Sequence, residues 1–128
     1  MIHITRETIL NVLRDARAKI DTPEKWTKGA YVRRGGVSLA DYPSSLTKNI
    51  QGADCYCASG ALWSVIPWGL SFYKSLIHDV VAKRVIRDTP FQDLIGFNDD
   101  EHTTHAMVLE AFDKAIAAEG RKSKNAVF

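Results

Sequence analysis

Residues 55–66 read CYCASGALWSVI, and this stretch decides the fold that we predict. Apart from Ser59 and Ser64 it is apolar or small all the way round, and a helix without a polar face is buried on most sides. The residues at positions 58–61 have almost no side chain, so neighbouring backbones can approach them closely. Asp54 precedes the stretch as a helix cap, and Pro67 ends it. We therefore predict a buried central helix over about residues 55–66.

The flanking sequence predicts further helices. Apolar residues at positions 9, 12, 13, 16 and 20 fall on one stripe of a 3.6-residue helix, with Thr5 as its N-cap and Pro23 just beyond its end. Similar patterns predict helices over about 71–86 and about 101–119. A short helical turn is expected at about 90–95, capped by Thr89 and ended by Gly96.

Local details complete the predicted fold, which is mainly α: a compact bundle of four to five helices around the central one. Gly35 and Gly36 favour the tight turn of a small β-hairpin at about 30–39. Asn98, Asp99 and Asp100 precede the last helix and are expected to cap it. The polar residues of the helix over 71–86 are expected to face water, namely Lys74, His78, Asp79, Lys83 and Arg84.

Length and composition are those of one globular domain, expected at residues 1–119 and followed by a flexible basic tail at 120–128. The chain has 128 residues, and its 17 basic and 15 acidic residues leave a net charge of +2, too balanced to imply a polyanionic partner. Two cysteines one residue apart favour reduced thiols. With no signal-peptide pattern and no stretch of ~20 apolar residues, we expect a cytoplasmic protein that uses neither membrane nor cofactor.

Four segments carry a resemblance to a known family: WTKGA at 26–30, CASGAL at 57–62, FND at 97–99, and FDKAI at 112–116 with Thr104 and Val108 ahead of it. In this order and spacing the chain resembles, over most of residues 8–118, a family of small bacterial and phage proteins classed as a domain of unknown function. The family pattern has Trp where this chain has Phe97, which keeps an aromatic side chain. The resemblance implies a bacterial or phage cytoplasmic setting and brings no catalytic residues.

A Cys–His pair is one candidate for chemistry. Cys57 lies near a predicted helix N-terminus, where the helix dipole lowers a thiol pKa. His105 extends the core face of the last helix, and Asn98 or Asp99 can orient its ring. The alternative is a buried structural thiol beside a capping histidine. A zinc site from Cys55, Cys57, His102 and His105 is disfavoured by the cysteine spacing, so we expect no metal.

Two surfaces are candidates for binding. Near the hairpin, Trp26 is interleaved with basic residues, which include Lys25, Lys28, Arg33 and Arg34, as in nucleic-acid-binding surfaces. Trp68 and Tyr73 flank a turn after Pro67, and such aromatic residues are typical anchors of protein interfaces. Asp99 belongs to a run of oxygen ligands that helix capping also explains.

From the sequence we expect a non-enzymatic protein-binding or regulatory module, directed at a host protein or at a second copy of the chain. The alternatives are a small enzyme using Cys57 and His105, and a nucleic-acid-binding protein using the hairpin region. If Trp26, Cys57, Asn98 and His105 converge on a polar-lined cavity, a ligand or active site becomes the first hypothesis.

Overall fold

The computed structural model describes residues 4–39 and 52–121, with the side chains of Trp68 and Ser71 left out. Within these ranges the α-helices are α1 (Arg6–Lys19), α3 (Ala58–Val65), α4 (Lys74–Ile86), α5 (Leu94–Asp99) and α6 (His105–Gly120). Two 3-10 helices are also present: η1 (Pro23–Lys25) precedes the β-hairpin, which we call the ribbon, and η3 (Trp68–Tyr73) precedes α4. The predicted mainly α fold is confirmed. Most of the predicted basic tail, residues 122–128, lies outside the described residues.

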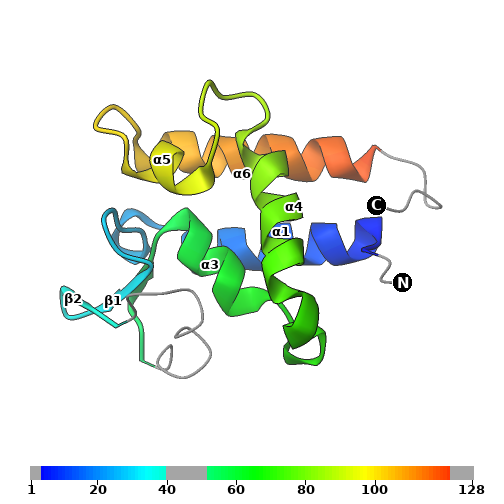
Figure 1. The fold of residues 1–128 in the computed structure, drawn as a ribbon. Helices are drawn as coiled ribbons and strands as arrows, with labels where there is room; N and C mark the ends of the chain where they lie inside the picture. The colour runs from blue at the N-terminus through cyan, green and yellow to red at the C-terminus, as the bar shows by residue number, and fades with distance from the viewer. Residues whose placement is uncertain (1–3, 40–51, 122–128) are drawn as a thin grey trace.

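The helices form two crossed layers (Figure 1). Helices α1 and α6 run side by side, and α4 crosses over both of them. Helix α3 packs against α1, α4 and α5, so it sits where the layers meet. Its residues from Ala58 to Leu62 are all buried, which confirms a buried helix at the centre of the bundle. No helix in the described ranges is long and apolar enough to span a bilayer.

The predicted hairpin is present, but it has a third strand that the sequence analysis missed. Strand β1 (Val32–Arg34) pairs antiparallel with β2 (Val37–Ser38) and with β3 (Cys55–Tyr56), in the order β2-β1-β3. Gly35 and Gly36 form the turn between β1 and β2 with φ angles of 58° and 83°, as expected for a tight hairpin turn.

The predicted start of the central helix at Cys55 is therefore wrong by three residues. The backbone of Cys55 pairs with Arg33 in the sheet, so it cannot also close a helical turn. Cys57 is the N-cap of α3, and its Sγ accepts a hydrogen bond from the amide of Gly60 at 3.2 Å. Asp54 does not cap the helix, because its carboxylate accepts instead from the amide of Gly35 at 2.9 Å.

The short helix near residue 90 is also displaced. It runs from Leu94 to Asp99, and Asp93 caps it by accepting from the amide of Gly96 at 2.6 Å. Gly96 therefore lies inside this helix rather than at its end. Thr89 instead turns back, donating its hydroxyl to the carbonyl of Ile86 at 2.8 Å. Side chains such as Thr and Asp can hydrogen-bond either to a helix N-terminus or to other nearby backbone groups. The sequence alone therefore does not determine which of two candidate residues caps a helix.

Helix α6 begins later than predicted. Thr104 is its N-cap and accepts from the amide of Met107 at 3.2 Å. Asn98 and Asp99 do not cap α6 as expected, because they belong to α5, and Asp100 is the C-cap of that same helix. The polar run before α6 is therefore available for contacts with other segments.

Gly60 sets how closely α3 approaches the ribbon. A Cβ atom added there would lie 2.7 Å from the carbonyl carbon of Tyr31 and closer still to its oxygen. The amide of Cys57 donates to the same Tyr31 oxygen at 2.9 Å, so the backbone cannot move away without losing that bond. This confirms the predicted close approach of backbones at the small residues.

We expect Gly60→Ala to lower the free energy of unfolding by about 3 kcal/mol, because the new methyl group overlaps backbone that cannot yield. Gly120→Ala is the matched control, since nothing lies within 4 Å of its Cβ position and both glycines are helical. Guanidinium unfolding of the two variants measures the difference. Equal stability of both variants would contradict the close approach of α3 to Tyr31.

Candidate functional site

The side chain of Asn98 joins three of the four sequence motifs. It is fully buried, and its Oδ1 accepts from the indole Nε1 of Trp26 at 2.6 Å and from the amide of Ala58 at 3.0 Å. Its Nδ2 donates to the carbonyl of Thr27 at 3.1 Å and to Asp99 Oδ1 at 2.9 Å. All four hydrogen-bonding positions of the amide are used. Helix α5, the Trp26 segment and the first turn of α3 therefore meet at one residue.

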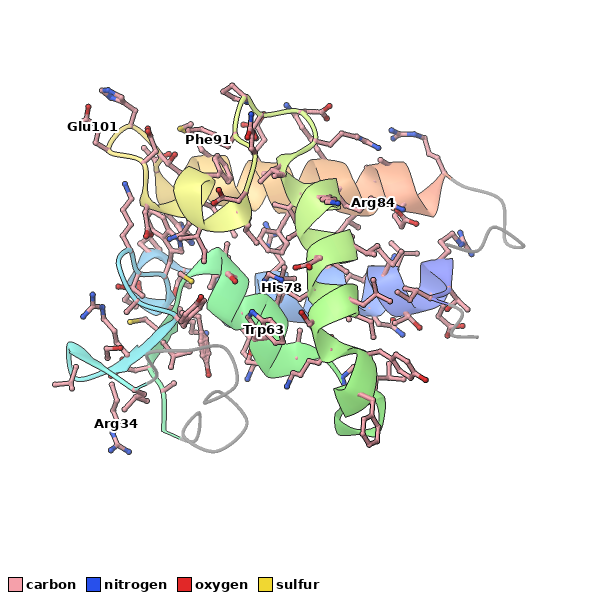
Figure 2. All side chains as sticks on the ribbon, viewed as in Figure 1. Arg34, Trp63, His78, Arg84, Phe91 and Glu101 are labelled. Atoms are coloured by element: carbon pink, nitrogen blue, oxygen red, sulfur yellow. The ribbon has the colours of Figure 1, made fainter. Side chains whose placement is uncertain are left out.

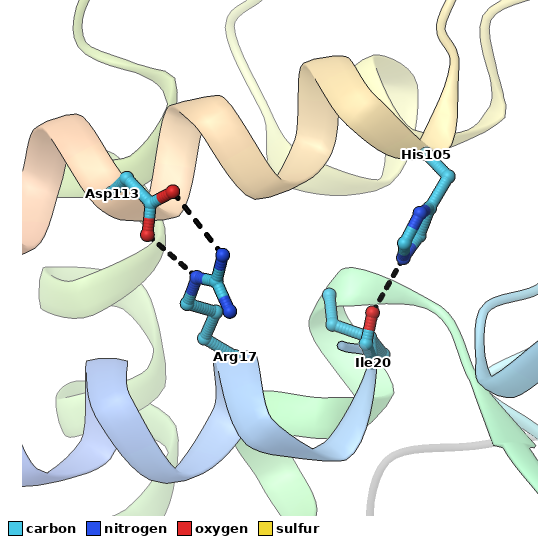
Figure 3. A network of polar contacts seen from close by, with 4 residues as sticks. All are labelled: Arg17, Ile20, His105 and Asp113. Atoms are coloured by element: carbon cyan, nitrogen blue, oxygen red, sulfur yellow. Dashed lines mark hydrogen bonds and ion pairs between the residues drawn. The ribbon is translucent and has the colours of Figure 1, made fainter. Parts of the chain in front are cut away.

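His105 lies at the same junction, but its hydrogen bond is to the end of α1. Its ring centroid is 5.8 Å from that of Trp26, and its Nε2 lies 2.6 Å from the carbonyl oxygen of Ile20 (Figure 3). Ile20 is the C-cap of α1, whose last carbonyls lack partners within the helix. On the same face, Arg17 pairs with Asp113 at 2.6 Å. His105 thus ties the first turn of α6 to the end of α1.

A cavity of about 230 Å³ adjoins the junction. Cys57, Tyr31 and Asp99 are among its lining residues, whereas Trp26, Asn98 and His105 are not. Asp99 Oδ1 is already held by the amide of Gly29 at 3.1 Å. The four residues singled out from the sequence converge in space, but only one of them lines this cavity.

Burial makes Cys57 a poor nucleophile. The residue is 3% exposed, and burial raises the pKa of its thiol to about 11, although the amide of Gly60 opposes that shift. Burial also raises the pKa of Cys55. The contacts of His105 are with Ile20 and Trp26 rather than with a thiol. Cys57 Sγ therefore caps α3, and His105 contacts Ile20 and Trp26.

Acidic residues, cysteines and histidines do not gather into a metal-binding group anywhere in the ranges 4–39 and 52–121. His102 lies beside Glu101, with Nε2 3.2 Å from the carboxylate, and both side chains are exposed. The run of carboxylates before α6 is used for local contacts. Asp100 Oδ2, for example, accepts from the amide of His102 at 3.0 Å.

The basic residues near the ribbon are largely used within the fold. The guanidinium of Arg33 donates to Thr27 Oγ1 at 3.1 Å and to the carbonyls of Lys28 and Gly36 at 3.2 and 3.0 Å. Lys28 donates to the carbonyl of Asp100 at 2.6 Å. Arg34, at the end of the central strand β1, points away from the helices (Figure 2). Of the two basic residues of β1, Arg33 is half-buried and Arg34 is exposed.

An apolar patch occupies the junction of η3 and α4. Phe72 is 96% exposed, and Tyr73 and Leu76 are 44% and 46% exposed. We call these three residues the 72–76 patch. Tyr73 was singled out from the sequence, whereas the side chain of Trp68 lies outside the described part of the chain. No other large apolar side chain in the described ranges is as exposed as Phe72.

A third cluster was missed by the sequence analysis. Ser59 Oγ lies 2.7 Å from His78 Nε2, and His78 Nδ1 lies 3.1 Å from Asp79 Oδ1. Trp63 stacks on the imidazole with centroids 4.6 Å apart (Figure 2). The prediction that His78 faces water is wrong, because its side chain is only 12% exposed. The apolar stripe of α4 is broad enough that His78 lies at its edge and is covered by α3.

We expect Asn98→Ala to lower the free energy of unfolding by about 3 kcal/mol, because it strands the buried amide of Ala58 and the Trp26 indole. Asn11→Ala is the control, since Asn11 is exposed on α1, and it should change stability by less than about 0.5 kcal/mol. Thermal or chemical unfolding provides the measurement. A loss below about 1 kcal/mol for Asn98→Ala would show that the junction tolerates its removal.

We also expect the thiol of Cys57 to resist modification in the folded protein between pH 6 and 9. At pH 9 its thiolate fraction is about 1%, two units below a pKa of about 11. A Cys55→Ser variant isolates Cys57, and a maleimide reagent followed by mass spectrometry counts the modified thiols. The same variant unfolded in guanidinium should react completely. Fast labelling of the folded variant at pH 7 would restore Cys57 as a nucleophile.

The comparisons with known proteins agree with the sequence resemblance. A family model described as a family of unknown function, DUF6197, matches residues 4–118. Neither the curated proteins nor the solved structures contain a match to the chain. The matched range includes the Asn98 junction, the 72–76 patch and the Ser59–His78 contact. Because the match to this family model covers most of the sequence, the chain belongs to the DUF6197 family.

Proposed function

We propose that this protein is a non-enzymatic binding or regulatory module that contacts another protein through the 72–76 patch. The observation that supports the proposal is the exposure of Phe72, which is 96%. Burying a Phe side chain stabilises a contact by about 1.5–3 kcal/mol, so leaving it in water forgoes that free energy. Tyr73 and Leu76 extend the apolar surface by one and four residues along the start of α4.

The patch has the composition of an interface anchor. Aromatic residues are enriched at the energetic centres of protein interfaces, and Phe72 and Tyr73 are adjacent. Lys74 follows them, and burial lowers the pKa of its amine. One positive charge beside apolar rings favours a partner surface that is apolar with acidic residues at its rim.

Nucleic acid is the weaker alternative. Three groups that sequence reasoning assigned to it are engaged inside the fold: Arg33 and Lys28 bind backbone carbonyls, and Lys25 lies 3.2 Å from Asp21. Binding to a phosphate backbone needs several free cations along one surface. The cellular setting that we propose is a bacterial or phage-infected cytoplasm, supported by the sequence resemblance and by two free cysteines.

We expect Phe72→Ser to reduce recovery of the partner about tenfold or more while leaving stability within about 0.5 kcal/mol of the original. Val37→Ser is the matched control, because Val37 is 65% exposed on β2, outside the patch. Affinity purification from bacterial lysate with quantitative mass spectrometry compares the three proteins. Sedimentation over a range of concentrations tests whether the partner is a second copy.

The two variants separate specific from nonspecific binding. A protein lost with Phe72→Ser but retained with Val37→Ser supports the patch as the contact surface. If the original protein and both variants recover the same proteins, or if Phe72→Ser alone unfolds the chain, the patch is not a free interaction surface and the proposal fails.

A further inference from the structure

We propose that Ser59, His78 and Asp79 form a nucleophilic site that accepts an acyl group from a small carboxylic ester. The site goes beyond the binding function and does not depend on it, because the 72–76 patch shares no residue with it. Its components come from the first turn of α3 and the middle of α4. They form a continuous chain of contacts, 2.7 Å from hydroxyl to imidazole and 3.1 Å from imidazole to carboxylate.

The contacts fix the direction of each hydrogen bond. The carboxylate of Asp79 can only accept, so Nδ1 of His78 carries a hydrogen and donates it. In the neutral ring Nε2 then has its lone pair free, and the hydroxyl of Ser59 donates to it. This is the arrangement in which a histidine removes a proton from a serine nucleophile.

The surroundings keep the imidazole neutral and in place. Burial lowers the pKa of His78, an effect that the charge of Asp79 partly opposes. Trp63 stacks on the ring at an interplanar angle of 16°, which restricts its rotation. The other charged groups at this position are Lys83, also on α4, and Asp93, which precedes α5. A neutral, oriented base near pH 7 is what proton abstraction needs.

A cavity gives a substrate access to the serine. It measures about 150 Å³, and its lining includes Ser59, His78 and Asp79, the charged residues Lys83 and Asp93, and apolar side chains of α4 and α5. Cavities of this size admit a ligand about as large as benzene. Ala82, Ile86 and Leu94 supply an apolar part of the wall, so a small apolar acyl group such as acetyl fits there. Ser59 is 1% exposed, which restricts attack to groups that enter this cavity.

The proposed reaction is an ordinary acyl transfer. Ser59 Oγ bonds to the ester carbonyl carbon as its proton passes to His78 Nε2. The carbon–oxygen bond to the alcohol breaks, and the alcohol leaves with that proton. Water then attacks the acyl-serine, loses a proton to His78, and Ser59 is restored with release of the acid. Ser59 lies in the first turn of α3, where the helix dipole favours the negative charge that develops.

Methanesulfonyl fluoride is the probe, because it is small and its Ser59 adduct forms with loss of fluoride. Intact mass and peptide mapping should show one adduct on Ser59 in the original protein. Ser64→Ala is the matched control on the same helix, since Ser64 donates to its own helix backbone at Ala61, and it should label equally. Ser59→Ala should lose the adduct, and His78→Gln should label about 100-fold more slowly.

The role of Asp79 as a positioning residue has its own readout. The labelling rate should rise with pH as His78 loses its proton, with a midpoint below the ordinary histidine value of about 6.5. Asp79→Asn should move that midpoint lower, because the carboxylate charge favours the protonated ring. If Asp79→Asn leaves the midpoint unchanged, the carboxylate does not act on the His78 ring, and Asp79 has no part in the proposed site.

Hydrolysis of 4-nitrophenyl acetate provides a second measurement on the same proteins, and it should be lost in Ser59→Ala but retained in Ser64→Ala. Circular dichroism confirms that each variant is folded. Two results would show that the Ser59–His78 contact is only a hydrogen bond between α3 and α4. One is that the folded unmutated protein is not labelled at Ser59 by excess methanesulfonyl fluoride, and the other is that His78→Gln is labelled as fast as the unmutated protein. Either result overturns the proposal.

Discussion

The buried amide of Asn98 is the interaction on which the rest of the structure depends. It reaches the Trp26 segment, the first turn of α3 and its own neighbour Asp99, and it satisfies groups on all of them. A buried amide with all its partners rigidifies its surroundings, whereas each partner left alone in the core costs free energy. The junction therefore fixes α5 against α3, and with it the walls of the cavities on both sides.

Gly60 supplies the second constraint, and the two act on one helix. Asn98 holds the amide of Ala58, and the missing side chain of Gly60 lets the helix sit against the carbonyl of Tyr31. Strand β3 leads directly into Cys57, so the sheet and α3 share a continuous backbone across the cap. The first turn of α3 is consequently held from three directions, which is the kind of rigid support that a positioned side chain such as Ser59 requires.

Much of the fold was predictable because it rests on local patterns. The stripe of α1, its cap at Thr5, and the glycine turn of the ribbon follow from periodicity and backbone freedom, and all are present. The start of α3 and the place of α5 were not predictable, because they depend on pairing with Arg33 and on a choice among competing caps. The candidate sites divide in the same way. The motifs suggested which residues to test for convergence in space, although they did not predict that the residues meet. The neighbours of His78 depend on how α4 crosses α3, and hydrophobic periodicity carries no information about that crossing.

The two nucleophilic side chains at the start of α3, Cys57 and Ser59, face different cavities, and their surroundings decide how reactive each one is. Cys57 lines one cavity with Asp99, and Ser59 lines another with His78, while Ile95 of α5 borders both. The thiol is the stronger nucleophile by nature, yet burial and the carboxylate of Asp99 raise its pKa, and its sulfur is used as a cap. The weaker hydroxyl has a neutral base beside it. On the acyl-transfer proposal, the environment therefore favours the hydroxyl of Ser59 over the thiol of Cys57 as the nucleophile. The 72–76 patch lies at the start of α4 and ends two residues before His78, but it shares no residue with the Ser59 site, so each can be altered by its own substitutions.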